Sequence, residues 1–465
     1  MSDVTKNLTE SLCYKNKSVY EATASATVSA AFDFAEPYKK YLDDAKTERE
    51  AVTASIKIAE EAGFVPYRFG MKVKPGDRYY FDNRGKNLFL FSIGTENVEN
   101  GIRISASHID SPRIDLKQNP LYEDNGMAFF KTHYYGGILK YQWMATPLAL
   151  HGVVALPSGE LLNVAIGEDD NDPVFYINDL LPHLGHDIAR KPLGDAIPAE
   201  KLNILVGSLP LAGEETESNS VKLAVLKFLN EKYGIVEEDF LSAELSIVPA
   251  AKARDIGFDR GFVGAYGHDD RVCAYPSLRA IIDAKESVHT LMCILADKEE
   301  IGSEGTSGMQ CELVLDLINA ISKDLGADPA IVRMNSKCLS ADVTAAYDPN
   351  FAEVFEKRNS SFAGHGVALM KFTGSRGKGG SNDASAEYIA WLRTVMANAG
   401  VVWQAGELGK VDVGGGGTVA KYIAKHNIET IDLGVPVISM HAPYEAISKV
   451  DLYETYKAFL AFSMH

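Results

Sequence analysis

Cysteine, basic charge and long hydrophobic runs are all scarce in this 465-residue sequence. The five cysteines include no Cys-x-x-Cys pair, which favours free thiols in a reducing compartment. Lys and Arg number 46 against 63 Asp and Glu, so the chain lacks the basic face that nucleic-acid binding needs. No charge-free apolar stretch reaches the roughly 18 residues of a membrane span, and residues 1–18 lack the apolar core of a signal peptide. We therefore expect a cytoplasmic protein with neither nucleic-acid nor membrane partners.

Motifs of two common kinds of active site are also missing. Four glycines at 414–417 precede Thr418 and a helical pattern, but no lysine follows them as a P-loop requires. This loop is then either a tight turn or a backbone surface that lies along a bound peptide. There is no Gly-x-Ser-x-Gly motif, and no cysteine lies in surroundings that would activate it. The sequence therefore argues against nucleotide binding and against a serine or cysteine nucleophile.

The hydrophobic pattern predicts two kinds of structure along the chain. Residues 254–465 alternate strand-like and helical runs, which indicates a mostly parallel sheet covered on both faces. Residues 118–253 lack that alternation and contain turn-bounded β runs, such as a hairpin at 151–167. We predict an α/β catalytic domain formed by residues 1–117 and 254–465, with a β-rich domain inserted at 118–253.

Local signals place several elements more closely. Thr47 and Glu50 form a capping box that starts a helix, and a turn at 83–85 joins two strands. We expect a helix that begins near Asn382 or Asp383, and one strand over residues 431–440.

Residues able to bind metal follow separate strand-like runs. In open parallel sheets, ligands bind beyond the carboxyl ends of the strands, because loops from several strands converge there. Four such runs lead into histidines or carboxylates, and a fifth candidate precedes a helix. The residues concerned are His108, Asp110, Asp269, Glu299, Glu300, Asp342 and His441.

This mixture of imidazoles and carboxylates suits a pair of divalent cations. A carboxylate can bridge two ions about 3.5–4 Å apart, because each of its oxygens holds one of them. Of the two neighbouring glutamates at 299–300, one can bind metal while the other stays free as general base for the attacking water. Taken singly, each residue has an ordinary explanation as a structural histidine, a helix cap or a solvated loop charge. The hypothesis depends on five segments supplying suitable ligands together.

Six segments resemble, in the same order, the motifs of the aspartyl aminopeptidase family, within the clan of di-zinc exopeptidases. They are SHIDSP (107–112), HDD (268–270), DKEEIGS (297–303), SADV (340–343), SNDA (381–384) and SMH (439–441). The pattern is closer to a bacterial branch of that family. The resemblance implies an α/β zinc-exopeptidase domain, an inserted dimerisation or lid domain, and assembly into a homo-oligomeric shell of twelve subunits.

The resemblance also implies roles for individual residues. Asp269 would bridge two divalent metal ions, zinc in the first place, with manganese or cobalt as alternatives. The remaining ligands would be His108, Glu300, Asp342 and His441. Glu299 would be the general base, and Asp110 would orient His108. His183 would reach the active site of a neighbouring subunit.

The expected reaction is removal of the N-terminal residue from a peptide. A preference for acidic N-terminal residues would require a local cation, and the candidates are His183, Lys371, Arg376 and Lys378. Two alternatives stay open. One is a related di-metal amidohydrolase, such as a deacylase or a carboxypeptidase. The other is a non-catalytic shell protein that keeps its metal for structure.

Overall fold

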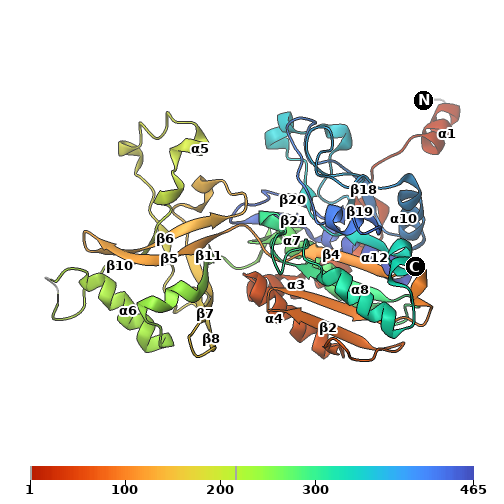
Figure 1. The fold of residues 1–465 in the computed structure, drawn as a ribbon. Coiled ribbons are helices and arrows are strands. Elements are labelled where there is room, and N and C mark those ends of the chain that lie inside the picture. The colour runs from red at the N-terminus through yellow and green to blue at the C-terminus, as the bar shows by residue number, and fades with distance from the viewer. Residues whose placement is uncertain (1–2, 215–216) are drawn as a thin grey trace.

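Two bodies make up the computed structural model, which describes residues 3–214 and 217–465 (Figure 1). The larger body holds a nine-stranded and a five-stranded sheet, and the smaller one holds a seven-stranded sheet. The strands of the smaller body all come from residues between Arg113 and Pro249. This arrangement confirms the α/β fold with an inserted β-rich part. The boundaries at 118 and 253, and a dimerisation or lid role for this part, stay predictions.

The nine-stranded sheet has a parallel centre. β14, β4, β15 and β19 run parallel to one another, whereas antiparallel pairs occur nearer the two edges. Segments that follow the four central strands therefore leave at the same edge of the sheet. In order across the sheet, the strands are β1 (Val65–Pro66), β2 (Arg78–Asn83), β3 (Asn87–Ser92), β14 (Leu291–Ala296), β4 (Arg103–His108), β15 (Lys337–Ser340), β19 (Glu429–Gly434), β17 (Val367–Met370) and β18 (Trp403–Ala405).

Helices cover both faces of this sheet, as the alternating pattern predicted. Every residue of β4 and β14 is buried, which is typical of central strands with helices on each side. One apolar core lies under α3 (Ser25–Asp44), α4 (Glu48–Glu61), α7 (His268–Asp283), α10 (Ala386–Asn398) and α12 (Lys449–Met464). The core on the opposite face lies under α8 (Leu313–Asp324), α9 (Pro329–Asn335) and α11 (Ala420–Ala424).

The expectation of one strand over 431–440 is wrong. β19 ends at Gly434, and the chain then enters the five-stranded sheet as β20. A side chain at Gly434 would lie 1.8 Å from the carbonyl oxygen of Asp342, so glycine permits this close crossing. The strands of the five-stranded sheet are β12 (Arg254–Ile256), β13 (Phe262–Ala265), β21 (Glu445–Ser448), β20 (Pro436–Ile438) and β16 (Thr344–Ala345).

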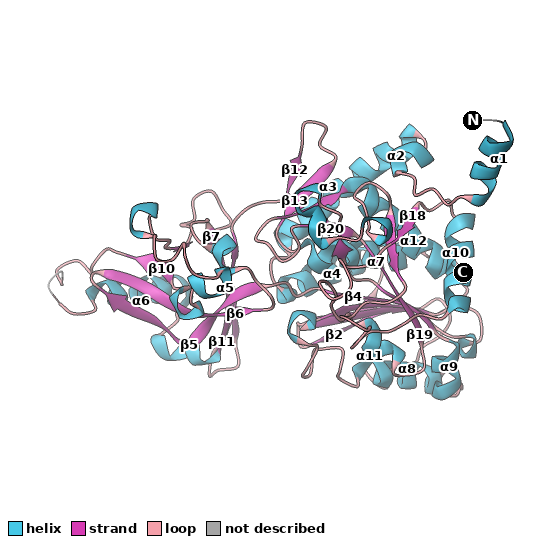
Figure 2. Ribbon diagram, turned by 90° about the horizontal axis from the view of Figure 1, so that it is seen from above, coloured by secondary structure: helices cyan, strands magenta, loops and turns pink. Residues whose placement is uncertain are grey.

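The seven-stranded sheet is antiparallel and has an apolar core of its own. The predicted hairpin is present, with β7 paired to β8. Figure 2 shows this sheet beside the larger body, with α5 (Leu193–Ala196) and α6 (Ser220–Tyr233) around it. Its strands are β8 (Leu161–Ile166), β7 (Leu148–Ala155), β11 (Ala243–Pro249), β5 (Arg113–Asp124), β6 (Met127–Tyr135), β10 (Ile204–Gly207) and β9 (Tyr176–Ile177).

A buried ionic cluster joins the two bodies. His151, on β7, donates through Nδ1 to Glu50 on α4, at 2.7 Å, and through Nε2 to Glu168 at 3.0 Å. Lys46 and Lys252 lie 3.8 Å and 2.5 Å from the carboxylate of Glu168. Burial alone would lower the pKa of His151, but the two carboxylates raise it from 6.5 to about 9. The imidazole is therefore charged at neutral pH and links the two carboxylates.

Two of the four closer placements are confirmed. The capping box forms, since the Thr47 backbone N–H donates to Glu50 at 2.9 Å, and β2 and β3 make the expected hairpin. The predicted start of α10 is wrong: its N-cap is Ser385. Asp383 instead pairs with two lysines, and Asn382 donates to the carbonyl of Thr430 at 2.6 Å. Among the described helices, none combines the length and hydrophobicity that crossing a bilayer needs.

Candidate active site

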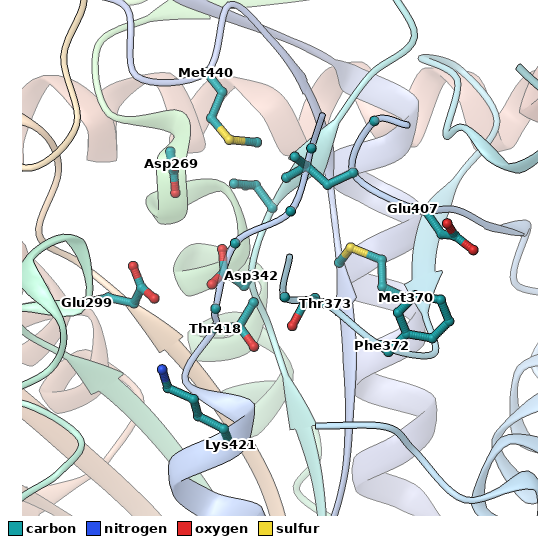
Figure 3. A pocket seen from close by; sticks show the side chains of 18 of the residues that line it. Asp269, Glu299, Asp342, Met370, Phe372, Thr373, Glu407, Thr418, Lys421 and Met440 are labelled. Carbon is teal, nitrogen blue, oxygen red and sulfur yellow. The ribbon is translucent and has the colours of Figure 1, made fainter. Parts of the chain in front are cut away.

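The candidate ligands from five separate segments meet at one end of a cavity of about 500 Å³. The topology explains the convergence, because β4, β14 and β15 are parallel and end side by side. Figure 3 shows Asp269, Glu299 and Asp342 around this end. The contributing residues are His108 at the end of β4, Asp269 at the start of α7, Glu299 and Glu300 in the short helix η6 (Glu299–Ile301) after β14, Asp342 after β15, and His441 after β20.

Asp269 lies between the two imidazoles. Its Oδ1 is 3.2 Å from Nε2 of His108, and its Oδ2 is 3.1 Å from Nε2 of His441. Burial alone would raise the pKa of Asp269, but the two imidazoles hold it below its usual range. One carboxylate thus presents a different oxygen to each histidine, as a bridging ligand does.

Hydrogen bonds fix the orientation of both imidazoles. Nδ1 of His108 donates to the backbone carbonyl of Asp110 at 3.0 Å, and Nδ1 of His441 donates to that of Gly137 at 2.7 Å. Since a carbonyl can only accept, Nδ1 carries the proton in both rings, and Nε2 of the neutral ring is left with a lone pair. This is how metal-binding histidines are usually held.

Further carboxylates surround this core. Oε1 of Glu300 lies 3.6 Å from Nε2 of His441, and Oδ1 of Asp342 lies 3.9 Å from Nε2 of His108. Burial is the main cause that raises the pKa of Glu300 and Asp342 well above the usual range, and nearby acidic groups add to it. Burial also raises the pKa of Glu299 to about 7. So many carboxylates in a buried site need cations beside them.

The donor set fits metal ions. Oδ1 of Asp269 and Oε1 of Glu300 are buried and accept no hydrogen bond from the described residues. Ligand atoms of His108, Asp269 and Glu300 all lie within 4.8 Å of one another, as do those of His108, Glu299 and Asp342. Imidazole nitrogens and carboxylate oxygens with free lone pairs are the ligands that zinc takes in catalytic sites. Burial alone would lower the pKa of His441, but the carboxylates of Asp269 and Glu300 raise it to about 10. The site therefore favours a positive charge at Nε2 of this ring.

Asp110 does more than orient His108. The hydrogen bond from the His108 ring goes to the Asp110 carbonyl, and the nearer carboxylate oxygen is 3.4 Å away. The carboxylate itself accepts the backbone N–H groups of Glu299, at 3.1 Å, and Glu300, at 3.2 Å. Asp110 therefore holds the pair of glutamates in place as well as the imidazole.

Sequence reasoning missed Glu445 as a supporting residue. Its carboxylate accepts the backbone N–H of His441 at 2.7 Å and that of Asp269 at 3.1 Å. His441 has a φ of +66°, which costs energy in a residue other than glycine, and the hydrogen bond to Glu445 helps to hold it. No local signal marks Glu445, because its two partners come from different segments of the chain.

The four predicted substrate-binding residues are not all at the cavity. Arg376 lines it, whereas Lys371 and Lys378 pair with Asp383 at 3.5 Å and 2.9 Å. His183 is exposed in the short helix η3 (Pro182–Leu184) of the smaller body and does not line this cavity. Its contact with a neighbouring subunit stays a prediction.

The wall opposite the carboxylates contains residues that the sequence did not single out. Met370 and Phe372 lie there with Glu407, as Figure 3 shows. Lys410 lines the cavity as Arg376 does. Lys421, on α11, extends into the same space as Thr418 and adds a third lining cation. This lysine stands one helical turn after the glycine loop and carries no motif of its own.

The glycine loop at 414–417 also lines the cavity. A side chain at Gly415 would lie 2.0 Å from the carbonyl oxygen of Gly374, and a side chain at Gly414 would lie 2.0 Å from that of Leu408. Glycine is needed there because neighbouring backbone passes within contact distance. Of the two interpretations of this loop, its position supports a backbone surface facing a bound substrate.

Comparisons with known proteins agree with this chemistry. The profile of the aminopeptidase I zinc metalloprotease family (M18) matches residues 41–463. A probable M18 family aminopeptidase 1 from Clostridium acetobutylicum is 49% identical over 457 residues, which cover 97% of this chain and 98% of the relative. The corresponding protein from Thermotoga maritima is 44% identical over 431 residues, covering 92% and 94%.

Solved structures give the same result. A crystal structure of an M18 aminopeptidase from Thermotoga maritima matches with a TM-score of 0.92 and 42% identity, covering 97% of this chain and 99% of the other. Aminopeptidase I from Clostridium acetobutylicum matches with a TM-score of 0.91 and 45% identity, covering 98% and 100%. The dodecamer of mApe1 from S. cerevisiae has a TM-score of 0.76 and 22% identity, covering 93% and 97%, and shows the shared fold.

Proposed function

Since the chain belongs to the aminopeptidase I zinc metalloprotease family (M18) and is a metal-dependent aminopeptidase, we propose that the cluster around Asp269 is its active site. The single observation that carries the proposal is the position of Asp269, with one oxygen 3.2 Å from His108 and the other 3.1 Å from His441. A carboxylate placed in this way can serve two metal ions at once.

Two divalent ions, zinc in the first place, would be held by five side chains. Asp269 would serve both ions, and each imidazole would offer its Nε2 to the site. Asp342 lies on the His108 side and Glu300 on the His441 side. When bound, the ions would hold the free amine of the peptide, polarise the scissile carbonyl and lower the pKa of the attacking water.

Glu299 is the general base in this proposal. It receives the proton of the attacking water and passes it to the amine of the leaving peptide. Burial raises the pKa of its carboxyl above the usual range, which is the direction that favours uptake of a proton. Its place beside the ligands depends on Asp110, which accepts its backbone N–H at 3.1 Å.

The substrate is a peptide with a free N-terminus. Its first residue lies near the carboxylate end of the cavity, and its backbone follows the glycine loop at 414–417. If acidic first residues are preferred, their carboxylate pairs with Arg376 or Lys421, two of the basic side chains that line the cavity. Lys371 and Lys378 are already engaged with Asp383 and contribute less.

We also propose that the protein works as a homo-oligomer in the cytoplasm, with the smaller body at the contact. Exposed aliphatic side chains there support the assembly, among them Leu180, Leu181, Leu184 and Leu193, which are 43–67% exposed. The dodecamer described for the S. cerevisiae protein of the same fold is the size we propose for the shell.

A comparison of free and acetylated peptides, combined with metal analysis, tests the function. We expect release of single residues from the N-terminus, no cleavage once the amine is acetylated, and close to two equivalents of metal per chain. Activity should be lost with a chelator and return with zinc, manganese or cobalt. Release of the acetyl group from acetylated peptides would indicate a deacylase. Release of single residues from the C-terminus would indicate a carboxypeptidase. A folded, metal-loaded protein without any cleavage would indicate a structural shell.

A further inference from the structure

The smaller body reaches directly into the metal centre. β6 of its sheet ends at Tyr135, and the next two residues are Gly136 and Gly137. In the sequence, the residues of this segment at 133–137 (His-Tyr-Tyr-Gly-Gly) read as packing aromatics and a surface histidine. In the structure, Tyr135 contacts Asp110, which holds the two glutamates at 299–300. Gly136 lies beside Glu300, and Gly137 contacts His441.

The hydroxyl of Tyr135 donates to Oδ2 of Asp110 at 2.8 Å. The same oxygen accepts the backbone N–H of Glu300, and the other accepts that of Glu299. Tyr135 is itself fixed from behind, because the guanidinium of Arg113 lies over its ring at 4.0 Å. Arg113 in turn binds Glu48 of the larger body at 2.9 Å. A continuous set of contacts thus links the domain junction to the pair of glutamates.

The two glycines bring backbone against the ligands. The carbonyl of Gly137 accepts Nδ1–H of His441 at 2.7 Å, which fixes the ring that offers Nε2 to the site. A Cβ at Gly136 would lie 3.2 Å from Oε2 of Glu300, and one at Gly137 would lie 3.4 Å from Nδ1 of His441. A side chain at Gly136 would press on Glu300, and its φ of +73° also favours glycine, whereas the 3.4 Å at Gly137 is an ordinary contact.

We propose that residues 135–137 form a positioning segment through which the inserted sheet sets the orientation of the metal centre. Tyr135 acts through Asp110 on the two glutamates, and the carbonyl of Gly137 acts on His441. The inserted body is therefore a structural part of the active site, in addition to any role at subunit contacts. This inference rests on the proposed function, because it assigns supports to the proposed ligands.

The substitution Tyr135→Phe tests the first arm. Phenylalanine keeps the ring under Arg113 and removes only the hydrogen bond to Asp110. Loss of one such outer hydrogen bond typically costs about 10–100-fold in metal affinity or activity. We expect metal to be lost to a competing chelator at roughly tenfold lower chelator concentration, and kcat to fall about tenfold with KM nearly unchanged.

Tyr134→Phe is the matched control. Tyr134 is the neighbouring residue on the same strand and is 39% exposed. Its ring stacks on His133 and lies outside the cavity lining. This variant should match the parent in metal retention and kcat. If Tyr135→Phe also matches the parent, with the parent binding metal and cleaving peptides, the positioning role is wrong while the proposed function stands.

Gly136→Ala tests the second arm by displacing the backbone of the segment, because Gly136 has a φ of +73° and a Cβ there would lie 3.2 Å from Oε2 of Glu300. Gly126→Ala is the control, since Gly126 has a similar φ of +77° and a Cβ there meets nothing within 4 Å. We expect Gly136→Ala to lower metal affinity and kcat relative to Gly126→Ala at a similar melting temperature of the two metal-free proteins. Equal metal affinity in the two glycine variants would overturn the positioning role of the glycine pair. A parent protein that neither binds metal nor cleaves peptides would instead refute the proposed function itself.

Discussion

The two sides of the cavity are built in different ways. The side proposed to bind metal is formed by short segments that follow the buried central strands, and its proposed ligands His108, Asp269 and Asp342 are 1–7% exposed. The opposite side consists of longer glycine-containing loops at 371–383 and 405–418, where Arg376 is exposed. Rigid core strands hold the atoms that must be placed closely for chemistry, while loops carry the contacts that select a substrate.

This comparison predicts distinct effects of substitutions on each side. Changes on the metal-binding side should alter kcat or metal content for every peptide. Changes on the loop side should alter the ratio of rates between peptides.

The largest effect is expected for Glu299→Gln. The amide cannot take up the proton of the attacking water, so kcat should fall by about 10²–10⁴-fold while the metal stays bound. Asp269→Asn is the contrasting variant, because a neutral amide makes a poor bridge and metal content itself should drop. Rates on a Leu-leading peptide and elemental analysis of both proteins separate the two effects. Near-parental turnover of Glu299→Gln would show that another group is the base.

Sequence patterns indicated the proposed metal ligands better than they indicated the residues that hold those ligands in place. The difference has a physical cause. His108, Asp342 and the glutamates at 299–300 follow apolar strands, and parallel strands place their ends together. Asp110 and Glu445 instead accept backbone N–H groups of Glu299 and Asp269, which are far away in the chain, and Tyr135 donates to the Asp110 carboxylate from a different domain. Such contacts depend on the folded path of the backbone and leave no periodic pattern in the sequence.

The helices and strands also differ in how far their sequence signals extend. The capping box at Thr47 and the hairpin of β2 and β3 depend on neighbouring residues, and both were predicted correctly. The break after Gly434 depends on the backbone of Asp342, nearly a hundred positions earlier. The start of α10 is local, because the hydroxyl of its N-cap Ser385 accepts the backbone N–H of Tyr388. Local rules therefore identified elements, while long-range packing decided where β19 ends.

A smaller effect is expected on the loop side. If Arg376 and Lys421 recognise acidic first residues, replacing both by methionine should lower the rate ratio of Asp-leading to Leu-leading peptides about tenfold, equivalent to about 1.4 kcal/mol. The rate on the Leu-leading peptide and the metal content should change little. Lys378→Met serves as control, because Lys378 pairs with Asp383 outside the cavity lining. An unchanged ratio in the double variant would exclude these cations as the source of an acidic preference.

The smallest effect on catalysis is expected at the ionic cluster between the two bodies, which lies on neither side of the cavity. Folding raises the pKa of His151 from 6.5 to about 9, so its contribution to stability is fully present below pH 6.5 and is lost as the pH rises through about 9. That shift is worth at most about 3 kcal/mol. Its partner Glu168 behaves oppositely: burial would raise its pKa, but His151 and Lys46 lower it to about 2, so its contribution is lost as the pH falls from 4.5 toward 2.

Replacing His151 by glutamine should therefore lower the melting temperature most at pH 6.5, with a difference from the parent that shrinks by pH 9.5. His133→Gln is the control, since His133 is exposed and, among the described residues, its ring donates to the carbonyl of its neighbour Tyr134 alone, at 2.9 Å. The kcat of His151→Gln at 25 °C should stay close to that of the parent, because the cluster contacts no proposed ligand. A difference in melting temperature that stays constant with pH would mean that His151 stabilises the junction by packing alone. A large fall in kcat would mean instead that the junction as a whole, and not only residues 135–137, holds the metal centre in place.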